Sequence, residues 1–439
     1  MKNMNSLGAI LSNIRESTGM SLSEVQKLTD IDTSYLSRIE TGKRIPTKEQ
    51  IGILSTVYKC EKNILMNYRD SEKIISEVKD KARLLSIIEL IKQRITPSLK
   101  KQSDYISIRN RRYIGNKAKL LNWIDSVLKD QVKDAEIFFD VFAGSGVVSD
   151  YFSSRFKKIV INDFLYSNET IYRAFFEKSD FSQNKVDNLI EYYNNIDKRK
   201  LSPNYFSKNF GGKFFSVNTA KKIGAIRNDI EKRKKELTQK EYCILLTVLI
   251  YGIDKIANTV GHFDAYIKKK AIEDELILKP ILLNEKNCDF SVYRTDSNLL
   301  ARNIESDVAY IDPPYNSRQY SRFYHLYETL VKWDKPKLYG VAMKPAPENM
   351  SQFCTSNAKE TFSDLIKSLN SKYILTSYNN TYNAKSSSSE NKISLKDIES
   401  ILKAKGNTRI FKQSYKYFNT GKTDFSNHME YLFFTEVSR

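Results

Sequence analysis

The chain has 439 residues, well beyond one common domain, so we expect several domains. Its formal net charge of +19 favours a polyanionic partner, nucleic acid before an anionic membrane, because Lys and Arg release counterions from phosphates. No apolar run approaches the ~20 residues that span a bilayer, and the stretch MKNMNSLGAI lacks the features of a signal peptide, so we expect a soluble, intracellular protein.

Residues 7–58 contain four short helical patterns separated by polar turns. The stretches 21–24 and 47–50 are S/T-x-x-E/Q capping boxes, and Asp32 is a favourable N-cap for the third helix. The apolar positions that suit two short helices packed across a tight turn are Leu22, Val25, Leu28, Ile31, Leu36 and Ile39. This pattern is typical of a helix-turn-helix.

The helix-turn-helix pattern, with the run SRIETGKRIPT, resembles the Cro/repressor family of DNA-binding domains. The resemblance implies an all-α domain over residues 1–70 whose third helix enters the major groove. The residues that it implies for DNA contact are Thr33, Ser34, Tyr35 and Arg38. The alternative is a small helical bundle that packs only on protein.

A charged helical pattern follows over residues 71–105, and its apolar residues mark one face. We interpret this segment as a helical connector that packs on another part of the protein.

From residue 137 the sequence alternates between strand and helix. The apolar run 137–142 predicts a buried strand, 144–146 a glycine turn, 147–156 a helix and 159–161 the next strand. A glycine turn lets the backbone approach a ligand, and an acid about 20 residues further on accepts hydrogen bonds from ribose hydroxyls. The turn lacks the third glycine of the dinucleotide fingerprint, which disfavours a nicotinamide cofactor. By itself the turn also fits any α/β protein.

Five short motifs occur in order along the chain. They are RYIGNK (112–117), DVFAGSG (140–146), ND (162–163), TD (295–296) and DPPY (312–315). The adjacent prolines of DPPY end the strand predicted just before them, because proline cannot continue a central ladder. The order resembles the DNA-adenine methyltransferases whose target-recognition region precedes DPPY, and most of all their bacterial restriction-modification branch.

That resemblance implies a class I (Rossmann-like) α/β methyltransferase domain over 106–175 and 288–439. It implies an inserted, helical target-recognition region over 176–287 and the cofactor S-adenosylmethionine. Carried over by position, the cofactor contacts are Tyr113, Lys117, Asp140, Phe142, Ala143, Gly144, Ser145, Gly146, Asp163 and Asp296. Of these, Tyr113 and Lys117 border the methionine end, Asp163 holds the ribose and Asp296 contacts the adenine, unless Asp296 is a plain turn residue.

The catalytic candidates are Asp312, Pro313, Pro314 and Tyr315. The exocyclic nitrogen of adenine is a poor nucleophile because its lone pair is delocalised into the ring. If Asp312 and the carbonyl of Pro313 accept its two N–H groups, the lone pair is directed at the methyl group. Tyr315 offers a flat face to an adenine rotated out of the duplex, and no covalent enzyme intermediate is needed.

Further DNA contacts are predicted from basic and amide side chains. Tyr320, Tyr324 and Tyr327 form a helical stripe that fits a core better than a base-stacking platform, whereas Arg318 and Arg322 lie off that stripe. The insertion offers Lys208 and Lys213 for phosphates and Asn258 for a base edge, unless these are solvated surface residues. The cysteines and histidines are scattered, so we predict no metal site.

We interpret the protein as a site-specific adenine-N6 methyltransferase of duplex DNA that flips its target base. We expect it to be the modification enzyme of a type II restriction-modification system, paired with a restriction endonuclease, at the nucleoid in the bacterial cytoplasm. The resemblance offers a role for the helix-turn-helix, which is to bind the protein's own promoter and limit expression; the alternative is that it adds affinity near each methylation site. The alternatives are an RNA adenine methyltransferase and a transcriptional regulator whose methyltransferase fold senses a ligand. An amino-methyltransferase for cytosine is disfavoured, because those enzymes more often carry Ser than Asp before PPY.

Overall fold

The computed structural model divides into two compact units, residues Met1–Lys101 and Gln102–Arg439. It describes residues 6–58, 60, 62–78, 80, 83–84, 86–87, 104–268, 275–283, 286–381, 390–414 and 428–438. Within these residues, no helix combines the length and the apolar character that crossing a membrane requires.

The first unit is a bundle of short helices around a small apolar core. Its helices are α1 (Leu7–Ser17), α2 (Leu22–Thr29), α3 (Thr33–Glu40), α4 (Lys48–Val57) and α5 (Lys62–Glu77). The capping boxes at the starts of α2 and α4 form as predicted, and Asp32 caps α3 by accepting from the Ser34 amide. Of the predicted apolar positions, Leu28 is wrong, because 60% of its surface is exposed.

Helix α5 crosses the predicted domain boundary at residue 70. Glu72 accepts a hydrogen bond of 2.6 Å from the backbone amide of Leu7, so the beginning of the predicted connector packs on α1. Most of the connector's remaining residues, up to 103, lie outside the described residues.

The second unit contains a seven-stranded sheet in the order β3-β2-β1-β4-β5-β7-β6. Its strands are β1 (Ile137–Asp140), β2 (Lys158–Asn162), β3 (Asp289–Tyr293), β4 (Glu305–Ile311), β5 (Asn370–Asn379), β6 (Gly406–Ser414) and β7 (Met429–Val437). The first five strands in this order, β3, β2, β1, β4 and β5, are parallel to one another. Strand β7 lies between β5 and β6 and is antiparallel to both. The Rossmann-like α/β class predicted from the motifs is confirmed.

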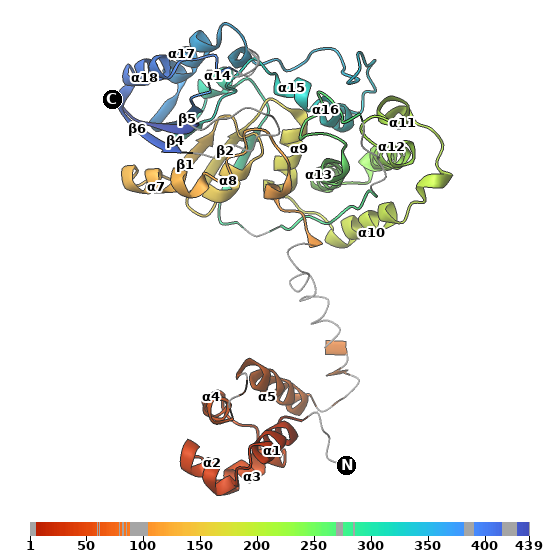
Figure 1. The fold of residues 1–439 in the computed structure, drawn as a ribbon, viewed down its shortest axis with the longest axis vertical. Coiled ribbons are helices and arrows are strands. Elements are labelled where there is room, and N and C mark those ends of the chain that lie inside the picture. The colour runs from red at the N-terminus through yellow and green to blue at the C-terminus, as the bar shows by residue number, and fades with distance from the viewer. Residues whose placement is uncertain are drawn as a thin grey trace. The chain divides into compact units, whose positions relative to one another are not determined.

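Helices cover both faces of the sheet (Figure 1). One face carries α7 (Leu121–Gln131), α8 (Val147–Phe152) and α9 (Tyr166–Phe176), and the other carries α14 (Ser297–Ala301), α17 (Ala358–Ser368) and α18 (Leu395–Lys403). Because both faces are buried, β1 begins with the apolar run 137–139 and β4 ends with the apolar run 308–311, as their sequences predicted.

The predicted insertion forms helices beyond α9 in Figure 1. They are α10 (Gln183–Asn194), α11 (Tyr205–Phe210), α12 (Val217–Lys232) and α13 (Gln239–Ile256), with α15 (Tyr320–Phe323) and α16 (His325–Lys332) beside them. Helix α13 is apolar nearly all round, packs on α9 and shares its core, so this part of the insertion supports the catalytic unit. The 3₁₀ turns are Ile108–Asn110, Lys198–Lys200, Arg233–Lys235 and Gln352–Cys354.

Candidate active site

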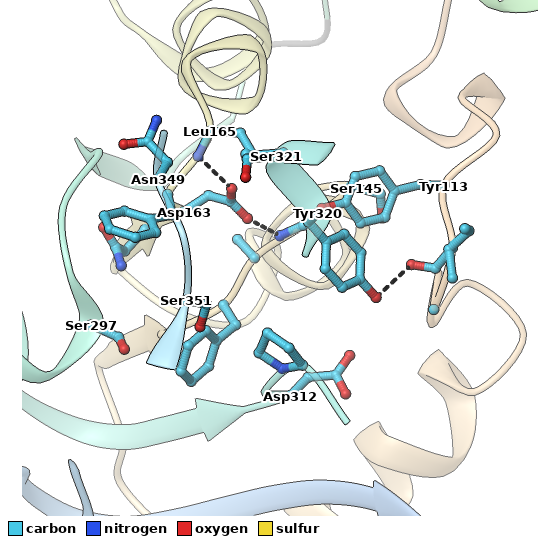
Figure 2. Close-up of a pocket in the computed structure, with 18 of the residues that line it drawn as sticks. Tyr113, Ser145, Asp163, Leu165, Ser297, Asp312, Tyr320, Ser321, Asn349 and Ser351 are labelled. Atoms are coloured by element: carbon cyan, nitrogen blue, oxygen red, sulfur yellow. Dashed lines mark hydrogen bonds between the residues drawn. The ribbon is translucent and has the colours of Figure 1, made fainter. Parts of the chain in front are cut away.

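A cavity of about 900 Å³, including its open mouth, lies at the carboxyl ends of β1, β2 and β4 (Figure 2). The strand order reverses at β1, and such a reversal point is where open parallel sheets bind ligands. The cavity is lined by these residues predicted from the sequence: Tyr113, Lys117, Phe142, Ala143, Gly144, Ser145, Asp163, Asp296, Asp312 and Pro314. The fold therefore brings together side chains from all five motifs.

The glycine turn between β1 and α8 forms one wall of the cavity. Gly144 has φ +54°, and a Cβ atom added to it would lie 2.9 Å from Cε1 of Tyr113. Gly146 has φ +77° and precedes α8, but it does not line the cavity. A side chain at position 144 would therefore both strain the backbone and fill the cavity.

Asp163 lies beside this turn and is held by backbone donors. Its Oδ2 accepts from the Gly144 amide at 3.0 Å and its Oδ1 from the Leu165 amide at 2.9 Å, as Figure 2 shows. Burial raises the pKa of Asp163, and these amide donors oppose that shift by stabilising the anion. The Asn168 side chain also lowers this pKa by a hydrogen bond, and with three donors the carboxylate still keeps a lone pair for a ligand hydroxyl.

Two other predicted cofactor contacts have structural partners. Asp296 caps α14 by accepting from the Asn298 and Leu299 amides, although it still lines the cavity. Asp140 does not line it: the residue is fully buried and accepts from the Ser149 hydroxyl at 2.7 Å. Burial raises the pKa of Asp140 to about 7. Asp140 therefore braces the start of α8 below the turn.

The wall beside the turn is aromatic and is backed by a buried cation. The ring of Tyr113 stacks on Tyr324 at 4.9 Å and on Tyr320 at 5.6 Å. Arg111, 3% exposed, lies 4.9 Å from the Tyr113 ring and donates to Asn168 at 2.6 Å. Tyr324 is core, as its helical spacing predicted, but Tyr320 lines the cavity. Sequence reasoning missed Arg111, because no local pattern marks a buried arginine.

Asp312 follows β4 at the far side of the cavity, where it meets a tyrosine and a lysine. The Tyr315 hydroxyl donates to Oδ1 of Asp312, and Nζ of Lys117 donates to that hydroxyl at 2.7 Å. The ammonium also lies 3.3 Å from Oδ1 of Asp312 and 3.7 Å from Oε2 of Glu430, a residue that sequence reasoning missed. Burial raises the pKa of Asp312 to about 6, whereas Lys117 lowers it.

Tyr315 does not line the cavity in this conformation. Its ring packs edge-on against Tyr378, with 4.7 Å between centroids and 67° between planes. Its hydroxyl donates to Asp312 and accepts from Lys117. The ring of Tyr315, which was predicted to stack on the target base, is therefore held in place through its hydrogen bond to Asp312.

Residues 113–384 match the D12 class N6 adenine-specific DNA methyltransferase family, and residues 11–65 match a helix-turn-helix family. The chain belongs to the D12 class. The resemblance read from the five motifs is thereby confirmed, as is the helix-turn-helix pattern.

Curated relatives of this D12 protein include three modification enzymes. The type II methyltransferase M.FokI of Planomicrobium okeanokoites is 32% identical over 349 residues, covering 74% of this chain and 52% of that protein. M.NlaIII of Neisseria lactamica is 30% identical over 340 residues, 74% of this chain and 98% of that protein. The modification methylase LlaI of Lactococcus lactis subsp. lactis is 33% identical over 291 residues, 61% of this chain and 46% of that protein. The chain thus spans about half of M.FokI and LlaI.

The predicted DNA contacts of the D12 domain differ in exposure. Lys208 is exposed, whereas Nζ of Lys213 donates to the Asn209 carbonyl at 3.2 Å. Asn258 is 2% exposed and its amide donates to the Lys213 and Ile267 carbonyls, so it ties a loop together and does not present a base-reading edge. The Asn258 prediction failed because a sequence does not show which amides are buried.

The two arginines after DPPY contact neighbouring residues of the same unit. Arg322 donates to the Pro345 carbonyl at 2.7 Å, and the guanidinium of Arg318 lies 5.8 Å from the ring of Phe323. Both side chains are half-buried.

The candidates in the helix-turn-helix share the accessible part of α3. Ser34 and Arg38 are exposed, and Thr33 and Tyr35 are half-buried. Arg44 lies 4.3 Å from the ring of Tyr35, which adds a cation to that surface.

Proposed function

We propose that the protein transfers the methyl group of S-adenosylmethionine to the amino nitrogen of adenine at a specific site in duplex DNA. The observation that carries this proposal is the half-buried carboxylate of Asp312, which opens onto the same cavity as the glycine turn and Asp163. An acceptor for the target amino group and a cradle for the cofactor then share one space.

The cavity suits S-adenosylmethionine in the chemistry of its lining. Asp163 and Asp296 offer acceptors for hydroxyl and amino groups, Phe142 and Val148 offer apolar surface, and the bare backbone of Gly144 leaves room. The cofactor, when bound, supplies a methyl group activated by a sulfonium.

The chain's own contribution to the reaction is position and charge. Asp312 and the carbonyl of Pro313 accept the two N–H groups of the adenine, so the lone pair of its nitrogen is freed from the ring. An adenine must leave the base stack to reach a carboxylate that lines a cavity.

We assign the enzyme to a type II restriction-modification system in the bacterial cytoplasm, at the nucleoid, with a restriction endonuclease as its functional partner. The names of the relatives support this assignment, since M.FokI and M.NlaIII are type II methyltransferases. An RNA substrate is less well supported because the matching family acts on DNA. A ligand-sensing regulator is less well supported because it would need no carboxylate like that of Asp312 at the cavity.

The test is to incubate the protein with labelled S-adenosylmethionine and plasmid DNA, and to map modified bases by single-molecule sequencing. We expect N6-methyladenine at one recurring sequence. Label on RNA alone, on cytosine, or on nothing contradicts the proposal.

The helix-turn-helix unit has a separate role in this proposal: it binds a promoter and limits expression. Removal of residues 1–101 should leave the methylated sequence unchanged and most of the turnover intact, because the cavity and all five motifs lie after that unit. The truncated protein should lose tight binding to one operator-like sequence. The truncation also removes phosphate contacts, so nonspecific, salt-sensitive affinity for DNA should fall whether or not the unit has a regulatory role. The test therefore measures the methylated sequence by sequencing and the operator-like site by footprinting.

A full-length control avoids the truncation. Arg38→Ala on the exposed side of α3 should abolish operator binding and leave methylation at its parental rate. If either variant methylates different sites, the unit takes part in target recognition and the regulatory role is wrong.

A further inference from the structure

One buried ammonium is shared by two carboxylates at the end of the sheet. Nζ of Lys117 lies 3.3 Å from Asp312 and 3.7 Å from Glu430, and all three side chains are at most 15% exposed. Lys117 precedes α7, Asp312 follows β4, and Glu430 lies on β7, so three separate segments converge there. The group carries one positive charge for two negative ones.

Among the described residues, Glu430 pairs with Lys117 and with His428, which is a cation only when it is protonated. Glu430 is 4% exposed on a strand whose other inward residues are mostly apolar, and it pairs across the sheet with Asn379. Its Oε2 accepts no hydrogen bond from the described residues, and its Oε1 lies 3.4 Å from Nε2 of His428. A buried carboxylate is costly unless it is paired, so Lys117 is its counterion.

We propose that Glu430 is a positioning residue for the methyl transfer: by sharing the ammonium of Lys117, it prevents that cation from closing on Asp312. Asp312 thereby remains a strong acceptor for the amino group of the target adenine. This inference rests on the proposed function.

Without Glu430, the ammonium would form a tight ion pair with Asp312, because charge-assisted contacts shorten when no second anion competes. The lone pairs that face the cavity would then be drawn toward Lys117. The present geometry shows the opposite, since the ammonium lies closest to the Tyr315 hydroxyl, at 2.7 Å, and farther from either carboxylate.

The proton balance of the reaction gives this arrangement a purpose. The amino nitrogen forms a bond to the methyl carbon as the carbon–sulfur bond breaks, and the electrons of that bond go to sulfur. The nitrogen then carries one proton too many. Its N–H bond breaks, the electron pair stays on nitrogen, and the proton goes to Asp312, which accepts it better when its negative charge is only partly neutralised.

Among the described residues, few other charges surround the two carboxylates. The titratable groups that face Asp312 are Lys117, Asp140, Tyr310, Tyr315, Tyr320 and Glu430. Those that face Glu430 are Lys117, Asp312, Tyr315 and His428. Burial raises the pKa of Asp312 to about 6, Lys117 and Tyr315 lower it, and the charge of Glu430 raises it.

The test compares Glu430→Gln with Glu436→Gln, which removes a carboxylate from an exposed position on the same strand. Methylation is measured in single turnovers with saturating S-adenosylmethionine across a pH series. The reaction needs ionised Asp312, so its rate falls as the pH falls through the pKa of that group. Loss of the Glu430 charge lowers the pKa of Asp312. The acid limb of the pH–rate profile, where the rate falls with falling pH, should therefore move about one pH unit downward.

The plateau rate of Glu430→Gln should fall about threefold to tenfold, because a weaker base accepts the proton less well. Glu436→Gln should behave like the parent. Glu430→Asp keeps the charge and should keep the acid limb near its parental position. Lys117→Met should move the limb in the opposite direction, to higher pH, which a merely structural role for these residues would not produce.

A second readout does not depend on activity. The Asp312 carboxyl can be followed by carbon-13 NMR in the full-length protein labelled at aspartate, with Asp312→Asn for assignment, and Glu430→Gln should lower its titration midpoint. If that midpoint and the acid limb both match those of Glu436→Gln, the inference is wrong although methylation stands. If the parent methylates no DNA, the proposed function fails, and an unshifted midpoint would independently refute the electrostatic link.

Discussion

Asp312→Asn should lower the single-turnover rate of DNA methylation by about 100-fold or more, the usual cost of losing one acceptor that acts in a transition state. The substitution keeps the size of the side chain but exchanges one acceptor oxygen for an amide donor that faces the amino group. The affinity for S-adenosylmethionine should change by less than about threefold, because Asp312 acts on the target base.

The matched control for Asp312 is Glu305→Gln. Glu305 is an exposed carboxylate at the opposite end of the same strand, β4, so its loss changes the charge equally without reaching the cavity. Both variants are compared by rapid-quench methylation and by calorimetry with the cofactor. Equal rates in Asp312→Asn and the parent would remove Asp312 from the mechanism.

Gly144→Val should weaken the binding of S-adenosylmethionine by about tenfold or more. The first reason is the backbone, since φ is +54° at this glycine and a β-branched residue is strained there. The second is space, since the new Cβ would lie 2.9 Å from the Tyr113 ring in the wall of the cavity. Titration calorimetry measures the effect.

Gly212→Val is the control for backbone strain outside the cavity. Gly212 has φ +73°, but a Cβ there meets no atom within 4 Å, so the variant carries backbone strain away from the cavity. It should bind the cofactor like the parent. Asp163→Ala should also weaken binding, because it removes the acceptor at the glycine turn. Unchanged affinity in both Gly144→Val and Asp163→Ala would mean that the cofactor binds elsewhere.

The parts of the protein that could be predicted from the sequence depend on near neighbours along the chain. The capping boxes at 21–24 and 47–50 are set within four residues, and both form. The glycine turn and DPPY each follow a strand whose apolar run is visible in the sequence. Parallel strands share one carboxyl edge, so motifs at strand ends meet without further information.

The contacts that escaped prediction depend on which distant segments pack together. Glu430 meets Lys117 only because β7 inserts between β5 and β6 and runs antiparallel there. Asn258 carries no local signal that its amide is buried and holds a loop, and Asp140 none that it braces a helix below the turn. The sequence by itself determined the fold class and the residues at the strand ends. Only the tertiary structure decided which charges share a buried space, because burial and the pairing of charges are set by neighbours far away in the chain.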